Sequence, residues 1–256
     1  MLLTIDIGNT FIDFGFFDGE ELRAVYKVAT KPLRSEDEYR SSLLLAFETV
    51  GIPKESIEDC ILSCVVPPLN ATFSSLCVSL FGKRPLILGP GLSSGVRLEV
   101  DNPSEVGADL VADAAGAKER FGGDLFIADL GTASKYILIT KDASFGGLSI
   151  APGLRLSIDA LTKGASALPE ITLLPPKKAI GKNTADCMNA GILFGTVYEV
   201  RGFAEAFERE SGRSLKKILT GGNAKYVSAL LPEFAYEPHL LLSGLEKIYS
   251  RNRRKR

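Results

Sequence analysis

Apolar and polar positions follow each other along the chain in a pattern that occurs twice. Residues 3 to 15, LTIDIGNTFIDFG, begin with an apolar run that is interrupted by Asp6. Residues 8 to 10 then have the composition of a turn, and the residues after them are again mostly apolar. Residues 126 to 139, FIADLGTASKYILI, repeat this order around Asp129. Each segment predicts a strand, a tight turn and a second strand. Because one such unit opens each half of the chain, the pattern suggests a duplicated architecture.

Helical spacing of apolar residues appears between these units. Residues 36 to 50, EDEYRSSLLLAFETV, predict a helix that stops at Gly51, and DCILSCVVPP predicts a buried strand that ends at two prolines. Further elements are expected as follows: a strand at 86 to 88, helices from about Pro103 to Gly122, near 154 to 164 and from about Ala185 to Ser211, and a strand end, glycine turn and helix cap at LTGGN, residues 219 to 223. Strands that alternate with helices in both halves indicate an α/β protein of two similar lobes.

Composition and charge remove several classes of function. Thirty basic and 31 acidic residues give a net charge of −1, so no overall field attracts nucleic acid or a membrane, and RNRRKR at 251 to 256 reads as a solvated end. One histidine and four cysteines without Cys-x-x-Cys spacing argue against a zinc site or a histidine-based triad. No run of membrane-spanning length occurs, so we expect a cytoplasmic protein with reduced thiols.

The two turns have the composition of a phosphate site. Glycine permits close approach of the backbone, and we expect it to supply unusual backbone angles there. Hydroxyls and backbone N–H groups then face the ligand, but Asp6 and Asp129 would repel a bare phosphate unless a cation lies between. A simple hairpin turn is the alternative interpretation. The second copy of the pattern favours a nucleotide site, and the absence of G-x-x-x-x-G-K-[ST] excludes a P-loop.

Two further features fit a nucleotide site. Asp109 and Asp113 lie four residues apart, so both carboxylates share one face of the predicted helix, where one of them could act as a base. On an exposed face the same pair would be ordinary. Paired glycines before Asn223 predict a helix N-terminus, which is suited to an anion.

Seven motifs together resemble those of type III pantothenate kinases, in the family's order and spacing from residue 1 to about 250. They are DIGNT from Asp6 to Thr10, DNPSEVGAD ending at Asp109, DLGTA from Asp129 to Ala133, GGLSIAPG at 146 to 153, GKNT ending at Thr184, LTGG at 219 to 222 and LLLSGLEKIY near the end. The resemblance implies the fold of acetate and sugar kinases, actin and heat-shock chaperones. That fold has two related lobes, here residues 1–118 and 119–256, built from duplicated mixed sheets flanked by helices, with ATP in the cleft between them.

The resemblance also implies an activity and its partners. The protein would phosphorylate pantothenate to 4'-phosphopantothenate, the first step of coenzyme A biosynthesis, using ATP and Mg²⁺. A monovalent cation, K⁺ or NH₄⁺, would lie beside the nucleotide. The enzyme would be a homodimer whose pantothenate site includes residues of the partner subunit.

The roles of individual residues follow from the same resemblance. Asp109 would be the general base that takes the proton of the pantothenate hydroxyl. Asp6 would hold the magnesium–phosphate end, Asp129 would bind the monovalent cation, and Thr184 would contact the pantothenate of the neighbouring subunit, unless it only caps the helix that follows. The nucleotide would contact Asp6, Ile7, Gly8, Asn9, Thr10, Phe11, Ile12, Asp13, Thr132, Gly221 and Gly222, and the substrate would contact Gly107, Ala108, Asp109, Leu110 and Thr184.

The chain departs from the family pattern at three places. Leu110 stands where an arginine helps to hold the substrate carboxylate, and leucine cannot fill that bidentate role. Ser134 and Lys135 replace two threonines after the second turn, and Val100 replaces a tyrosine. Because successive side chains of a strand alternate between faces, Lys135 should face away from Ser134, but the sequence does not settle which side it takes.

These departures leave three hypotheses. In the first, the enzyme is active and Lys135 replaces the monovalent cation or the missing arginine as a fixed positive charge. In the second, the chain is a catalytically weakened homologue that binds nucleotide and acts as a regulatory or scaffold protein. In the third, it is a kinase for a different small hydroxyl acceptor that lacks a carboxylate, which Leu110 would suit.

Overall fold

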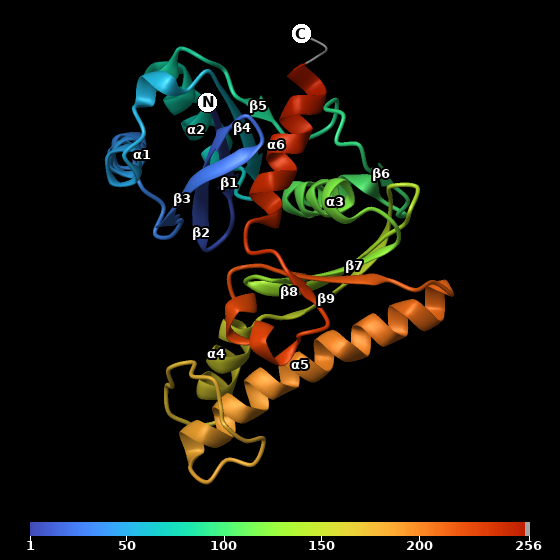
Figure 1. The fold of residues 1–256 in the computed structure, drawn as a ribbon. Helices are drawn as coiled ribbons and strands as arrows, with labels where there is room; N and C mark the ends of the chain where they lie inside the picture. The colour runs from blue at the N-terminus through green and yellow to red at the C-terminus, as the bar shows by residue number, and fades with distance from the viewer. Residues whose placement is uncertain (254–256) are drawn as a thin grey trace. The chain divides into compact units, whose positions relative to one another are not determined.

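The computed structural model describes residues 1–253, which form two compact units (Figure 1). The first unit comprises Met1–Arg97, Asp101–Glu119 and the segment from Leu240 onward, and the second comprises Leu98–Val100 and Arg120–His239. The sequence suggested one division, between residues 118 and 119. The structure instead groups the last helix with the first unit, because the apolar face of that helix packs against the first sheet.

The first unit is built on a five-stranded sheet with the order β3-β2-β1-β4-β5. Its strands are β1 (Leu2–Ile7), β2 (Phe11–Asp18), β3 (Glu21–Ala29), β4 (Asp59–Cys64) and β5 (Leu86–Ile87). β1 pairs antiparallel with β2 and parallel with β4, so the predicted hairpin lies at the centre of the sheet. Every residue of β1 is buried, as expected for a strand that is covered on both faces.

Four α-helices cover the two faces of this sheet. They are α1 (Glu36–Val50), α2 (Pro68–Phe81), α3 (Ala108–Phe121) and α6 (Leu240–Arg253). α1 and α2 pack on one face, where Tyr39 and Phe73 meet Phe14, and α3 and α6 pack on the other, where Ala112 and Leu245 meet Leu2. The short helices η1 (Lys54–Ser56) and η2 (Pro103–Glu105) lie in the connections.

The second unit repeats the strand order of the first. Its sheet reads β11-β10-β7-β8-β9-β6. The strands are β6 (Arg97–Leu98), β7 (Leu125–Leu130), β8 (Ala133–Ile139), β9 (Ser144–Pro152), β10 (Lys216–Thr220) and β11 (Ala235–Tyr236). β7, β8, β9, β10 and β11 correspond to β1, β2, β3, β4 and β5, with the same parallel and antiparallel pairings. This correspondence confirms the duplicated mixed sheets that the sequence predicted.

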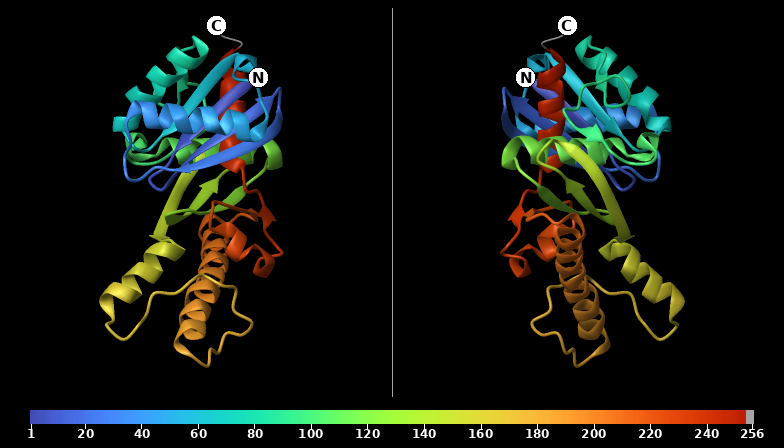
Figure 2. Two further views of the ribbon diagram at one scale, coloured as in Figure 1. Left: turned by 90° about the vertical axis from the view of Figure 1, so that its left-hand side faces the viewer. Right: turned by 90° about the vertical axis from the view of Figure 1, so that its right-hand side faces the viewer.

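Two long elements cover one face of the second sheet. α4 (Leu154–Gly164) and α5 (Thr184–Ser211) bury Leu154, Leu193 and Val200 against Phe126 and Tyr136. The loop before α5 runs back along that helix, where Asn189 Oδ1 accepts a hydrogen bond of 3.0 Å from the Leu174 N–H (Figure 2). The short helices η3 (Ala224–Tyr226) and η4 (Ser228–Leu230) follow β10. Among residues 1–253, no helix has both the length and the apolar character needed to cross a membrane.

Candidate active site

The first hairpin presents a braced turn between β1 and β2. The Gly8 N–H donates to the Phe11 carbonyl at 2.9 Å, and Thr30 at the end of β3 fixes the turn from the side. The Thr30 hydroxyl donates to the Gly8 carbonyl at 2.7 Å, and its N–H donates to the Thr10 carbonyl at 2.9 Å. Asn9 and Thr10 are exposed at the tip. This turn can therefore present polar groups to a ligand without changing shape.

The glycines of the two turns do not have unusual backbone angles. Neither Gly8 nor Gly131 is among the glycines with a positive φ, so that part of the sequence interpretation was wrong. A Cβ on Gly8 would instead lie 3.1 Å from the Phe11 carbonyl oxygen. Gly221, which follows β10, does have a positive φ of 92°.

Asp6 and Asp13 face each other across the first hairpin. They are directly opposite in the β1–β2 register, and alternation along β1 places Asp6 on the same face as Leu2, the face that α3 and α6 cover. Asp6 is 9% exposed. Lys27 on β3 forms an ion pair of 3.0 Å with Asp13. Two carboxylates thus lie at the carboxyl-terminal end of β1, beside the turn.

Asp109 reaches the same edge of the first sheet from α3. A Cβ on Gly107 would contact the Asp109 carboxylate and lie 3.8 Å from the Val65 side chain. Val65 follows β4, and its N–H donates to the Ile7 carbonyl at 3.0 Å. The start of α3 is therefore held at the ends of β1 and β4. The first unit consequently gathers Asp6, Asp13 and Asp109 at one edge.

The first turn of α3 also positions the residues around Asp109. Asp109 Oδ1 accepts a hydrogen bond of 2.9 Å from the Leu110 N–H, and Asp109 remains partly exposed. Asp113, one turn further along, is 1% exposed. Leu110, at the position of the family's arginine, is 6% exposed. Its side chain contributes apolar packing and no charge.

The second hairpin pairs a carboxylate with an ammonium group. Asp129 and Lys135 are directly opposite in the β7–β8 register, and Lys135 Nζ lies 2.6 Å from Asp129 Oδ2. The side chain of Lys135 is only 17% exposed and that of Asp129 only 10% exposed. The backbone of Gly221 leaves no room for a Cβ beside the other carboxylate oxygen, Asp129 Oδ1. Asp129 is thus enclosed by Lys135 and by the turn after β10.

The turn after Asp129 is held by two neighbours. Asn223 donates its N–H to the Leu130 carbonyl at 2.9 Å and its side-chain N–H to the Gly131 carbonyl at 2.8 Å. Gly153 packs so closely on this turn that its Cβ would lie 2.6 Å from the Gly131 carbonyl oxygen. Thr132 and Gly222 are exposed at this edge. Asn223 is the N-cap residue of η3, as predicted, but this helix has only three residues and the Asn223 side chain makes no capping bond.

Thr184 is exposed and begins α5. The cap of this helix is Asn183, whose Oδ1 accepts a hydrogen bond of 2.9 Å from the Asp186 N–H. The interpretation of Thr184 as a helix cap was therefore wrong. Thr184 and Asp109 belong to different units.

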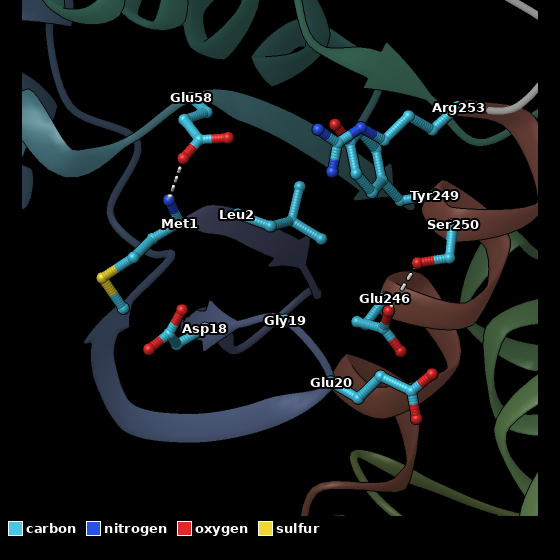
Figure 3. A pocket seen from close by; sticks show the side chains of 10 residues that line it. All are labelled: Met1, Leu2, Asp18, Gly19, Glu20, Glu58, Glu246, Tyr249, Ser250 and Arg253. Carbon is cyan, nitrogen blue, oxygen red and sulfur yellow. Dashed lines mark hydrogen bonds and ion pairs between the residues drawn. The ribbon is translucent and has the colours of Figure 1, made fainter.

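A pocket of about 180 Å³ in the first unit lies away from these groups. It is lined by the start of β1 and by the β2–β3 turn, at the opposite end of β1 from Asp6. Four carboxylates surround it, those of Asp18, Glu20, Glu58 and Glu246 (Figure 3). Glu246 is held by the Ser250 hydroxyl at 2.7 Å. Arg253 and the N-terminal ammonium group of Met1 also line the pocket, and none of the residues expected to contact the nucleotide does.

The motifs gave no indication of three residues near the first hairpin, namely Thr30, Val65 and Cys64. Cys64 ends β4 opposite Ile7, and its thiol donates to the Val66 carbonyl at 3.1 Å. Burial, and to a smaller extent the negative charge of Asp6, raise the pKa of this thiol. The contacts of Thr30 with Gly8 and of Val65 with Ile7 join residues far apart in the sequence, which local patterns do not report.

The residues of the two hairpins differ in the cations that they can hold. Mg²⁺ is usually bound by one or two carboxylates together with substrate phosphates, and Asp6 and Asp13 fit that requirement. Residues 1–253 contain no cluster of three or more His, Cys, Asp or Glu side chains that could enclose a metal without such a substrate. A monovalent cation does not fit beside Asp129, because an ammonium group already lies against one carboxylate oxygen and the backbone of Gly221 against the other.

Comparison with known proteins shows which solved structures share this arrangement of strands and helices. A solved structure from Campylobacter jejuni, titled as a Baf family transcriptional activator, matches with a TM-score of 0.62 and 16% identity over 98% of this chain and 99% of its own. The activator of 2-hydroxyisocaproyl-CoA dehydratase from Clostridium difficile, with bound ADPNP, matches with a TM-score of 0.54 and 11% identity over 99% and 95%. These likenesses show the fold, an α/β protein built from two duplicated mixed sheets that are flanked by helices.

Sequence similarity defines the family within this class. The model of the type III pantothenate kinase family matches residues 2–206. The type III pantothenate kinase of Roseiflexus sp. (strain RS-1) is 40% identical over 99% of this chain and 100% of its own length. That of Geobacter sulfurreducens is 39% identical over 99% and 100%. The chain belongs to the type III pantothenate kinase family.

Proposed function

We propose that the protein transfers the γ-phosphoryl group of ATP to pantothenate and forms 4'-phosphopantothenate, the first step of coenzyme A biosynthesis. The observation that carries the proposal is the gathering of Asp6, Asp13 and Asp109 at one edge of the first sheet. Two opposed carboxylates suit a magnesium–phosphate complex, and a third, partly exposed carboxylate suits a base. Phosphoryl transfer requires little more than such positioning and charge stabilisation.

Each residue in this proposal has a defined task. Asp6 holds the magnesium–phosphate end, where Mg²⁺ would neutralise charge on the phosphates. Asp109 accepts the proton of the pantothenate hydroxyl as that oxygen attacks the γ-phosphorus, while ADP leaves. Gly107, Ala108 and Leu110 border the acceptor beside Asp109. The phosphates contact the first turn and also Thr132 of the second turn, with Gly221 and Gly222 after β10.

The proposal includes a homodimer in which Thr184 of one subunit contacts the acceptor of the other. Support comes from α5, whose exposed face carries Gly191, Gly195 and Gly202 with Tyr198, which is 60% exposed. A Cβ on any of these glycines would meet nothing within 4 Å among the described residues. Small residues on one helical face let a second helix approach closely, and an exposed apolar patch marks an interaction site.

The proposed location is the cytoplasm. None of the four cysteines forms a disulfide, and Cys60 and Cys77 are buried in the core of the first unit. Free thiols are typical of proteins in a reducing compartment.

Mass spectrometry of the reaction product tests the proposal. Purified protein is incubated with MgATP and pantothenate, and we expect 4'-phosphopantothenate together with one ADP per product. Pantetheine serves as a parallel acceptor, because Leu110 cannot form an ion pair with the carboxylate that only pantothenate carries. Phosphorylation of pantetheine alone would redirect the proposal to a different acceptor. ATP binding without any product would support the regulatory alternative, which the full-length similarity to kinases does not favour.

A further inference from the structure

The two hairpins of the molecule provide an internal comparison of charge. β1 and β7 occupy equivalent positions in their sheets, and each carries an aspartate one residue before its last, Asp6 and Asp129. The residue directly opposite on the partner strand is Asp13 in the first hairpin and Lys135 in the second. In the first hairpin the opposite residue is a second carboxylate, which pairs at 3.0 Å with Lys27 of the neighbouring strand β3. In the second hairpin the opposite residue is itself the cation that pairs with the aspartate.

Three features make the second pair a fixed part of the structure. Lys135 Nζ lies 2.6 Å from Asp129 Oδ2, within the range of a strong charge-assisted hydrogen bond. Both residues lie within paired segments of a central hairpin, so the backbone fixes their separation. Both side chains are also largely shielded, at 17% and 10% exposed, and water screens the attraction less than it would at the surface.

The same features exclude a free cation from this carboxylate. A cation bound to Asp129 Oδ2 would displace the ammonium group or lie against it, and like charges at such separations repel. The Gly221 backbone packs against Oδ1 on one side, so closely that a Cβ on Gly221 would clash with this oxygen. Side-chain ammonium and a small monovalent cation carry the same charge, so one can take the electrostatic place of the other.

We propose that the Lys135 ammonium group serves as a built-in monovalent cation at Asp129, so that phosphoryl transfer by this chain does not depend on added K⁺ or NH₄⁺. The inference rests on the proposed kinase function. The inference goes beyond that function because it gives the positive charge beside Asp129 to the Lys135 side chain. The family resemblance implies instead that a dissolved cation supplies this charge.

Kinetics and thermal unfolding of the full chain test the inference together. Initial rates are measured with MgATP and pantothenate at constant ionic strength in the chloride of tetramethylammonium, K⁺ or NH₄⁺. Thermal unfolding is followed in the same three salts with MgADP present, because a bound ion raises the melting temperature whether or not the enzyme turns over. The variants are Lys135→Thr, which removes the ammonium and leaves space beside Asp129, and Lys163→Thr, an exposed lysine of α4, as the matched control.

We expect wild type and Lys163→Thr to have the same rate and the same melting temperature in all three salts. Lys135→Thr should lose roughly 10²-fold in rate in tetramethylammonium, the scale of removing one stabilising charge or donor. K⁺ or NH₄⁺ should restore much of that rate and should raise the melting temperature of this variant specifically.

Two results would overturn the inference. One is a wild-type rate or melting temperature that rises specifically with K⁺ or NH₄⁺, and the other is a Lys135→Thr variant that is fully active in tetramethylammonium. If wild type forms no product in any salt, the proposed function fails, and the melting temperatures still decide the inference. A K⁺-specific rise in wild type then overturns it, whereas a rise confined to Lys135→Thr supports it.

Discussion

Asp109 is the residue on which the proposed proton transfer depends. Its Oδ1 accepts the Leu110 N–H at 2.9 Å, and an asparagine oxygen can keep that bond while losing the basic site. We expect Asp109→Asn to lower kcat by about 10²- to 10⁴-fold, with little change in the KM for ATP. Steady-state kinetics measure both parameters.

The control for this variant is Glu119→Gln, an exposed carboxylate at the other end of α3, which should leave the kinetics unchanged. An Asp109→Asn enzyme that keeps the wild-type kcat and melting temperature would show that another group accepts the proton.

Individual site residues differed in how far the sequence could identify them. Asp6 and Asp129 stand out because each interrupts an apolar strand before a glycine turn. The direction of Lys135 could not be predicted, since alternation fixes only that it opposes Ser134, and the pairing with β7 decides which face it takes. Thr30 carries no local signal, because its partner Gly8 lies 22 residues away.

At the scale of elements, α3 and α6 cross at two glycines. A Cβ on Gly116 would lie 2.6 Å from the Leu240 carbonyl oxygen and 3.0 Å from the Gly244 nitrogen, both backbone atoms that cannot rotate away. Gly116→Ala must therefore force the helices apart, and we expect it to cost about 1–3 kcal/mol of the free energy of unfolding. Denaturant titration measures this loss.

Gly164→Ala is the comparison for that titration, because its Cβ would meet nothing within 4 Å. It should be neutral or slightly stabilising. Equal effects of the two substitutions would argue against a tight crossing of α3 and α6.

Packing of α5 against β8 makes stability depend on pH. Burial raises the pKa of the Glu199 carboxyl on α5. A carboxyl whose folded-state pKa is raised contributes stability below its unfolded pKa, and this contribution is lost as the pH rises through the folded pKa. Glu199→Gln carries no charge at any pH, so it should melt about 1–2 °C above wild type at pH 8.

The difference should disappear near pH 4, about the unfolded pKa of glutamate, because wild-type Glu199 is then neutral as well. Thermal unfolding across this range measures the effect. Glu205→Gln, exposed on the same helix, should show no such trend. A Glu199→Gln variant that is less stable than wild type at every pH would contradict this account.

Elements were predicted well where local chemistry defines both ends. α1 runs from Glu36 to Val50 as expected, because Ser35 forms a capping box with Glu38 and Gly51 closes the helix with a φ of 69°. α2 was missed, since two prolines that suggested the end of a strand also begin this helix. α3 was expected from Pro103 but begins at Ala108, because the proline belongs to the short helix η2.

At the scale of the whole molecule, the duplicated sheet order could be foreseen from the two hairpin patterns, whereas the return of α6 to the first unit could not. No local pattern indicates which sheet a terminal helix will cover. The proposed partner subunit raises the same difficulty. No local pattern tells what would cover the exposed glycine face of α5, and the proposed role of Thr184, remote in sequence from Asp109, depends on the proposed dimer.

Complementation between two inactive variants tests that dimer directly. Thr184→Glu places a negative charge where the proposal puts the anionic acceptor of the partner, and the first turn of α5 should tolerate it. Asp109→Asn and Thr184→Glu homodimers should both be nearly inactive. Random mixing of the two chains in co-expression makes half of the dimers mixed, and each mixed dimer contains one site with both native residues. We therefore expect about a quarter of the wild-type activity in the mixture. If Thr184 acted within its own chain, or if the chain were a monomer, every site would keep one defect. The mixture would then be as inactive as its components, whereas light scattering would still report whether a dimer had formed.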